Sequence, residues 1–177
     1  MSVHTIVLAA GEGSRMKSNR AKSLQRIGGT SMLHKICSTA GKISPKITLV
    51  VGFDKDSVIK EVDEYGLEIS IAEQPKAIGT GDAVKCGISK IRTESTVLVL
   101  YGDVPLIQEK TLRKLIEASN NNLSILTTVL DNPYGYGRVK KTMMEMLSLS
   151  LKKKMQPTKK EKLMKYLQVF YVGLNHF

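Results

Sequence analysis

Hydrophobic residues in the first 130 positions fall into short continuous or alternating runs, separated by segments in which they recur at helical spacing. A short continuous aliphatic run is typical of a strand buried on both faces, whereas strict alternation leaves one face exposed. The predicted strands cover residues 5–8, 46–52, 67–71, 96–100 and 123–130, and the predicted helices cover 31–40, 57–62, 79–90 and 109–119. This order predicts an α/β fold, a Rossmann-like, mostly parallel sheet with helices on both faces.

The first predicted strand ends in a glycine-rich loop, Leu8-Ala9-Ala10-Gly11-Glu12-Gly13-Ser14-Arg15-Met16. Glycine lets the backbone turn sharply and approach a ligand, and successive N–H groups can then hold an anion. Arg15 adds a planar set of donors that suits phosphate. The loop therefore indicates a phosphate or nucleotide site, although an ordinary turn after a strand has similar glycines. It lacks the third glycine of the dinucleotide-binding pattern and the G-K-[ST] of the P-loop.

Two further segments place polar groups near the glycine-rich loop or at the carboxyl end of a predicted strand, where ligands bind in open parallel sheets. Gln74 offers an acceptor and donors that suit the edge of a base, and Gly79-Thr80 opens a helix whose first N–H groups are free for a ligand. Lys22 is a candidate phosphate contact. The alternatives are an N-capped helix without a ligand and a solvent-exposed lysine.

The segment Tyr101-Gly102-Asp103 follows the most hydrophobic of the predicted strands and precedes Pro105. A carboxylate at the same edge as the phosphate-binding loops is what Mg²⁺ needs to bridge to a triphosphate. We therefore predict that Asp103 binds Mg²⁺. The alternative is a carboxylate that only caps a turn or a helix.

Composition sets the broad class of the protein. The chain has 177 residues, 42% of them hydrophobic and 24% charged, which is typical of one globular domain. No hydrophobic stretch reaches the length of a membrane span and the N-terminus lacks a signal-peptide pattern, so we expect a cytoplasmic protein. Cys37 and Cys86 are expected to be buried free thiols rather than a disulfide or a metal site.

The formal net charge of +11 raises the question of a nucleic-acid or membrane partner. Its distribution argues against both. Residues 1–137 hold 17 Lys+Arg and 14 Asp+Glu, whereas residues 138–177 hold 10 and 2. Most of the excess therefore belongs to the last 40 residues, and we expect neither a nucleic acid nor a membrane as partner.

Together, these motifs resemble a known enzyme family. The glycine-rich loop resembles the L-A-A-G-x-G-[ST]-R-M signature of sugar-phosphate nucleotidyltransferases. G-T-G-x-A at 79–83, L-Y-G-D-V-P-L at 100–106 and D-[DN]-P-x-G-Y-G-R-[IV] at 131–139 are similar to the uridyltransferase half of the bacterial bifunctional enzymes that make UDP-N-acetylglucosamine. The resemblance runs from Val3 to about Lys141. One departure is Ala21, which replaces the proline of P-K-x-L and is expected to loosen the loop.

The resemblance implies a reaction between UTP and N-acetylglucosamine 1-phosphate that gives UDP-N-acetylglucosamine and pyrophosphate, with Mg²⁺ as cofactor. It implies that Arg15 and Lys22 neutralise phosphate oxygens, that Asp103 holds Mg²⁺ and that Gly137 contacts the sugar. The remaining nucleotide-binding residues implied by the family are Leu8, Ala9, Ala10, Gly11, Gln74, Gly79, Thr80, Tyr101 and Gly102. The alternatives are a thymidylyl- or guanylyltransferase and a non-catalytic basic binding module.

After Lys141 the resemblance breaks down, and we predict a partial nucleotidyltransferase domain at 1–141 followed by a Lys- and Met-rich tail at 142–177. From the resemblance we expect this chain to lack the family's sugar-contacting Glu and Asn, a second metal ligand and the left-handed β-helix acetyltransferase domain, through which intact members homo-oligomerise. The nucleotidyltransferase fold is therefore expected to be incomplete at its C-terminal end, which should expose hydrophobic sheet edges.

Methionine has one codon, so part of the DNA behind the tail can be inferred. Read one nucleotide out of frame, the Met143/Met144 junction gives Asp, Met144/Glu145 gives Gly, Met155/Gln156 gives Ala and Met164/Lys165 gives Glu. These residues fall where the family has them, around a V-E-E-K-D-A-T motif, whereas the Tyr166/Leu167 junction cannot give the expected Asn. We predict a one-nucleotide frameshift near Lys140 and Lys141. The alternative is a genuine basic tail, and the DNA sequence distinguishes the two.

Overall fold

A computed structural model of the protein describes residues 2–13, 18–120, 122–129, 131, 138–141, 147–150 and 165–174. The chain divides into two compact units. The first contains residues 1–124 and 170–177, and the second contains residues 125–169. The domain boundary that we predict at Lys141 from the sequence remains a prediction.

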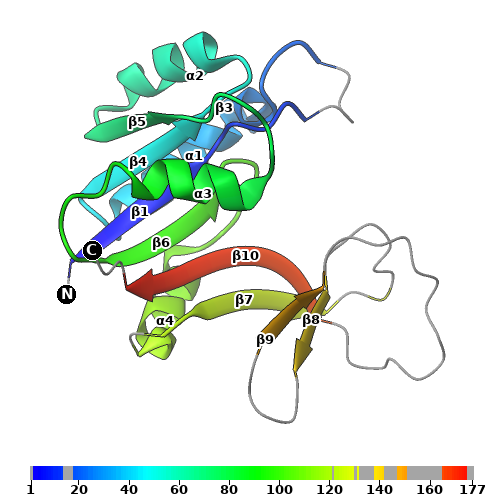
Figure 1. Ribbon diagram of the computed structural model, residues 1–177. Helices are drawn as coiled ribbons and strands as arrows, with labels where there is room; N and C mark the ends of the chain where they lie inside the picture. Colours follow the sequence, from blue (N-terminus) through cyan, green and yellow to red (C-terminus); the bar gives the residue numbers. More distant parts are fainter. Residues whose placement is uncertain are drawn as a thin grey trace. The chain divides into compact units, whose positions relative to one another are not determined.

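A parallel sheet forms the centre of the first unit (Figure 1). β1 (Val3–Leu8) lies between β4 (Lys46–Val51) and β6 (Thr96–Tyr101), and β5 (Ile69–Glu73) pairs with β4, all in parallel. The strand order is β5-β4-β1-β6, and residues 171–174 add an antiparallel strand end beside β6. The chain builds the sheet outward from β1 on one side and then returns to place β6 on the other, so the strand order reverses at β1. Ligands bind at such a reversal in open α/β sheets.

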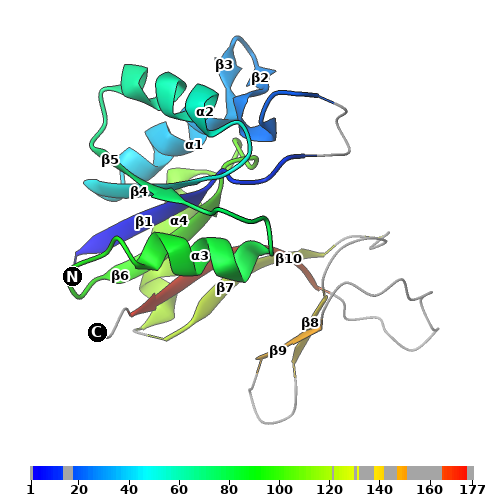
Figure 2. The ribbon, with the colours of Figure 1, turned by 45° about the horizontal axis from the view of Figure 1, so that its top comes forward.

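Helices cover both faces of this sheet, with α3 on one face and α1 on the other (Figure 2). The helices are α1 (Met32–Gly41), α2 (Lys55–Val62), α3 (Thr80–Ile88) and α4 (Glu109–Ser119). Shorter elements are the 3-10 helices η2 (Lys22–Leu24) and η3 (Asp63–Tyr65) and the two-stranded sheet of β2 (Arg26–Ile27) and β3 (Thr30–Ser31). The mostly parallel α/β fold predicted from the sequence is therefore confirmed.

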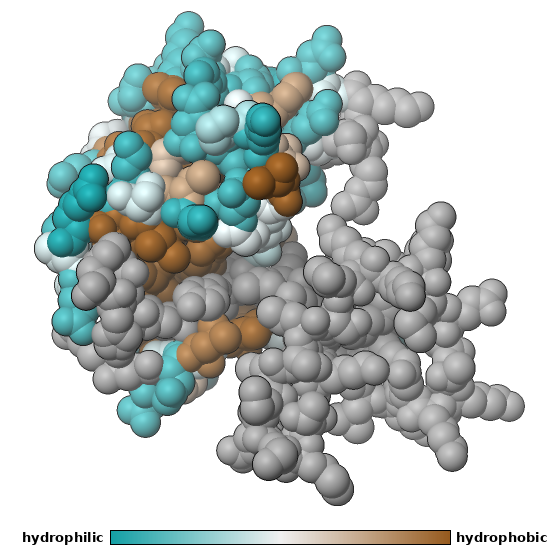
Figure 3. All heavy atoms as spheres, viewed as in Figure 1, coloured by the Kyte–Doolittle hydropathy of each residue, from teal (hydrophilic) through white to brown (hydrophobic). Residues whose placement is uncertain are grey.

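Alternating side chains divide the core between the two faces of the sheet. Ile6, Val50 and Val99 belong to one hydrophobic cluster together with Ala83 of α3. A Cβ added at Gly87 of α3 would lie 2.6 Å from the Ile6 side chain, so α3 packs closely on this face. The neighbouring strand residues point to the opposite face, where α1 buries its hydrophobic side. In the space-filling view, hydrophobic residues gather beside α3, whereas hydrophilic residues dominate around α2 (Figure 3).

The second unit contains β8 (Arg138–Lys141) and β9 (Leu147–Ser150), which pair antiparallel. β10 (Lys165–Leu174) begins in this unit, where Lys165 and Tyr166 pair with β8. β7 (Ser124–Val129) contributes all but its first residue to the same unit.

Most boundaries predicted from the hydrophobic pattern lie within a few residues of those in the structure, and α4 coincides with its prediction. Two adjacent residues at the start of α1, Thr30 and Ser31, are both of types that commonly cap a helix. The Ser31 hydroxyl accepts a hydrogen bond from the His34 N–H at 3.0 Å, so Ser31 and not Thr30 is the N-cap.

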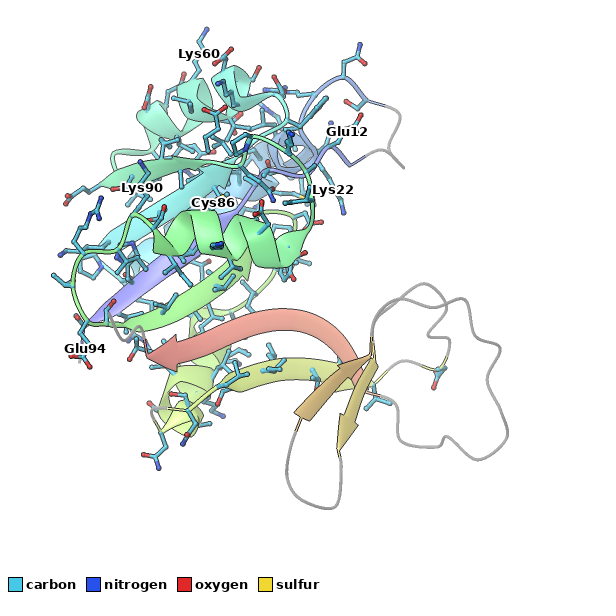
Figure 4. The ribbon with its side chains drawn as sticks, in the orientation of Figure 1. Glu12, Lys22, Lys60, Cys86, Lys90 and Glu94 are labelled. Carbon is cyan, nitrogen blue, oxygen red and sulfur yellow. The ribbon has the colours of Figure 1, made fainter. Side chains whose placement is uncertain are left out.

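Both cysteines are free thiols, as predicted. Cys37 is buried in α1, and burial raises the pKa of its thiol to about 12. A thiol with so high a pKa stays protonated at physiological pH and is a poor nucleophile. Cys86, which Figure 4 shows on α3, is only partly buried. No helix among the described residues is long and hydrophobic enough to span a membrane.

Candidate functional site

The carboxyl ends of β1, β5 and β6 meet at one edge of the parallel sheet, and the segments that follow them surround a hollow of about 300 Å³. Figure 4 shows Glu12 and Lys22 at this edge, near the start of α3, whereas Lys90 and Glu94 lie at the opposite end. The predicted site residues that line the hollow are Leu8, Ala9, Ala10, Gly11, Lys22, Gln74, Gly79, Thr80, Tyr101 and Asp103. Residues far apart in the sequence are therefore brought together.

Three predicted residues are not among those that line the hollow. Gly102 lies beneath it, where its N–H donates to the Leu8 carbonyl at 2.9 Å and ties the end of β6 to the end of β1. Arg15 and Gly137 lie outside the described residues, so their predicted contacts with phosphate and sugar remain predictions.

The glycine-rich loop passes close to Lys22. Gly13 has a φ of +66°, and a Cβ at this position would lie 2.7 Å from the Lys22 Cβ. Any other residue would therefore combine an unfavourable backbone conformation with a steric clash. The second glycine of the loop lets its backbone run directly beside the lysine.

Lys22 is held in place by its neighbours in η2. Leu24 is fully buried and anchors the turn, and Ala21 is also fully buried. The N–H of Ala21 donates to the Asp54 Oδ2 at 2.9 Å, a hydrogen bond that proline cannot make. The loosening that we expect from the loss of the family's proline is therefore opposed by a new hydrogen bond to α2's N-cap residue.

Lys22 and Asp103 form an ion pair across the hollow, with 2.6 Å between Nζ and Oδ2. Their side chains are 37% and 34% exposed, so both charges keep part of their hydration. A partly exposed pair contributes little to folding stability, of the order of 0–1 kcal/mol. Because both side chains are partly exposed, a phosphate could replace Asp103 as the partner of Lys22, and a cation could replace Lys22 as the partner of Asp103.

Tyr101, at the end of β6, connects this pair to α3. Burial raises the pKa of its phenol, a hydrogen bond with the Thr80 side chain lowers it and the nearby Asp103 charge raises it again. Because the net shift is upward, the phenol is neutral at physiological pH and available for hydrogen bonding. The Thr80 contact joins the first turn of α3 to the end of β6, two residues before Asp103.

Gln74, just after β5, lines the hollow and is 93% buried. Its backbone N–H donates to the Val51 carbonyl at 2.8 Å, and its side-chain Nε2 donates to the Gly79 carbonyl at 3.0 Å and to the Asp82 Oδ2 at 2.8 Å. Gly79 has a φ of +128°, which residues with a side chain rarely adopt. Glycine is thus required where the chain enters α3.

Sequence reasoning did not single out Ser23 and Asp82, which take part in this arrangement. Ser23 lines the hollow, and Asp82 holds Gln74. The pattern gives little signal for either residue, since a serine beside a lysine and an aspartate in the first turn of a helix are both common.

We expect Ser23→Ala to stabilise the protein. The Ser23 side chain is 4% exposed and its hydroxyl has no hydrogen-bond partner within the described part of the chain. A buried hydroxyl without a partner costs about 1–3 kcal/mol, and alanine removes the hydroxyl while leaving only a small void. Chemical denaturation should show an increase in the free energy of unfolding of about 1 kcal/mol. An unchanged or lower value would mean that the hydroxyl has a partner in solution.

The residues of the hollow fit a magnesium ion held mainly by a substrate. No group of three or more His, Cys, Asp or Glu side chains gathers among the described residues, so the chain there offers no closed metal cage. Mg²⁺ bound with a triphosphate takes one or two carboxylates from the protein and fills its other positions with phosphate oxygens and water. Asp103 meets this requirement because its carboxylate is partly exposed at the hollow.

Comparison with known proteins shows which domain family and which relatives the chain resembles. The model of the MobA-like NTP transferase domain family matches residues 5–156. The bifunctional protein GlmU of Neisseria meningitidis serogroup C (strain FAM18) is 42% identical over 139 residues, and that of Ruthia magnifica is 41% identical over the same length. Each match covers 78% of this chain, and the chain spans only 30% of the length of these relatives. The resemblance drawn from the motifs is confirmed.

The fold has close counterparts among solved structures. HddC from Yersinia pseudotuberculosis superposes with a TM-score of 0.71, covering 98% of this chain and 76% of that one at 19% identity. At this identity the likeness concerns the fold alone.

Proposed function

Because the chain belongs to the MobA-like NTP transferase domain family, we propose that its site is built for uridyl transfer from UTP to N-acetylglucosamine 1-phosphate. The observation that supports this most strongly is the meeting of Lys22, Asp103 and Gln74 around one hollow at the carboxyl edge of a parallel sheet. A cation, a carboxylate and an amide are the groups needed for phosphates, a divalent cation and a base. The choice of uridine and of the sugar rests on the similarity to GlmU.

In the proposed reaction, an oxygen of the sugar phosphate forms a bond to the α-phosphorus of UTP, and the bond to pyrophosphate breaks. The attacking oxygen belongs to a substrate, so no nucleophile from the protein is required. The protein's task is then to align two anions and neutralise their charge. Lys22 would hold phosphate oxygens, Arg15 would add a second cation, and Gln74 would seat the base beside the glycine-rich loop.

The carboxylate of Asp103 would hold Mg²⁺, which when bound supplies positive charge against the phosphates. In the structure that carboxylate is paired with Lys22 at 2.6 Å. We propose that substrate binding breaks this ion pair. Lys22 would then contact a phosphate of the substrate, and Asp103 would contact the cation. The pair would keep both charges neutralised until the substrate arrives.

We also propose that this chain is impaired. The tail at 142–177 lacks the sugar-contacting residues expected from the resemblance, and a frameshift near Lys140 and Lys141 explains why. We therefore expect weak UTP binding and no measurable turnover. Sequencing the encoding DNA tests the frameshift. If the codons of the tail, read one nucleotide out of frame, do not encode V-E-E-K-D-A-T, the frameshift hypothesis is wrong.

Thermal denaturation with each nucleoside triphosphate and Mg²⁺ tests the proposed function. We expect UTP to raise the melting temperature more than CTP or ATP. Stabilisation by TTP or GTP alone would point to a thymidylyl- or guanylyltransferase instead. A pyrophosphate-release assay with N-acetylglucosamine 1-phosphate tests the impairment. A rate near that of an intact GlmU, run in parallel, would contradict it.

A further inference from the structure

The orientation of the Gln74 side-chain amide is decided by its partners. Nε2 lies 3.0 Å from the Gly79 carbonyl oxygen and 2.8 Å from the Asp82 Oδ2. The nitrogen and oxygen of an amide are hard to distinguish by shape and are assigned from the hydrogen-bond network. Here both neighbours are acceptors without a proton to give, so the NH₂ group must face them. Both amide protons are thereby used inside the protein.

The amide oxygen of Gln74 is left as the group that a ligand meets. Among the described residues, Oε1 accepts no hydrogen bond. With Nε2 donating to Gly79 and Asp82, Oε1 is the polar atom of the amide that stays available to a ligand. Because Gln74 lines the hollow, the hollow presents an acceptor, and not a donor, at this position.

We propose that Asp82 is a positioning residue that sets the base preference of the site by holding the Gln74 amide in this orientation. The inference rests on the proposed function and narrows the class of base that the same hollow accepts. A fixed acceptor favours bases that carry a ring N–H on the edge they present, namely uracil, thymine and guanine. Cytosine has an unprotonated N3 at that position and its nearest donor is the exocyclic amino group, so an acceptor aligned with N3 is repelled by cytosine and bound by uracil.

The chemistry of Asp82 explains why it can act in this way. An ionised carboxylate only accepts hydrogen bonds, so it permits one orientation of the amide. Asparagine at the same position can donate as well, and it would tolerate a Gln74 amide turned by 180°. The Gly79 carbonyl would still oppose that turn. We therefore expect a reduction of the base preference and not a reversal.

The test compares the affinities of UTP and CTP, both with Mg²⁺, for the full chain by ligand-observed NMR. In Asp82→Asn the ratio of CTP to UTP dissociation constants should fall about 5- to 10-fold, a smaller effect than loss of a whole hydrogen-bonded pair. Asp82→Ala removes the acceptor without adding a donor, so its ratio should lie between those of the wild type and Asp82→Asn. Asp56→Asn, an acid in the first turn of α2, is the matched control and should leave the ratio unchanged.

The outcomes separate this inference from the proposed function. If the wild type prefers UTP and Asp82→Asn keeps the same ratio, or weakens both nucleotides equally, Asp82 has only a structural role and the inference is wrong. If the wild type prefers CTP or binds no nucleotide, the proposed function and the inference both fail. Melting temperatures of the variants identify any that do not fold, and the order of the three ratios then rests on those that do.

Discussion

Asp103→Asn should abolish the dependence of nucleotide binding on Mg²⁺. The carboxylate is the charged group of the hollow suited to a hard cation, and asparagine keeps its size while removing its charge. Hydrogen bonds and contacts with charged groups contribute about 1.5–3 kcal/mol, which corresponds to a loss of about 10- to 100-fold in the affinity measured with Mg²⁺. Titration of UTP with and without Mg²⁺ measures the effect.

The fold should tolerate this change. The ion pair with Lys22 is about one-third exposed on each side, so the free energy of unfolding should fall by less than about 1 kcal/mol. Glu73→Gln is a matched control, because it breaks the exposed pair with Lys55 at 2.9 Å outside the hollow. The assignment of Asp103 would be refuted if both variants bound UTP with the same Mg²⁺ dependence as the wild type.

Gly79→Ala should disturb the site although the added methyl group meets no other atom within 4 Å. The φ of +128° is strained for alanine by about 1–3 kcal/mol, and relief of that strain would move the Gly79 carbonyl. That carbonyl accepts from the Gln74 Nε2 at 3.0 Å and from the Ala83 N–H at 3.2 Å. We expect UTP affinity to fall about 10-fold or more, in line with the loss of one to two hydrogen bonds. Calorimetric titration measures it.

Gly81→Ala provides the control for this prediction. Gly81 lies two residues further along, inside α3, and a Cβ there would meet nothing within 4 Å. Alanine is favoured over glycine in a helix by about 0.5–1 kcal/mol, so Gly81→Ala should be neutral or stabilising. Equal losses of UTP affinity in the two variants would show that any methyl group added at the start of α3 blocks the ligand. The backbone argument for Gly79 would then be wrong.

Much of the fold depends on short stretches of sequence, and the hydrophobic pattern therefore predicts it. β1, β4 and β6 are continuous aliphatic runs, and a run of this kind has few alternatives to a buried strand. The helix cap shows where local information ends. Thr30 and Ser31 are both good caps, and only the position of the His34 N–H selects Ser31.

The order of residues alone specifies the α/β architecture, the edge of the sheet at which the loops gather and the kinds of side chain that these loops carry. These follow from periodicity and from the rule that parallel strands share one carboxyl edge. The tertiary structure alone decided which groups touch: Lys22 with Asp103, Gln74 with Asp82 and Ala21 with Asp54. Each pair joins residues from different turns or strand ends, and a hydrogen bond depends on tenths of an ångström that no periodicity in the sequence encodes.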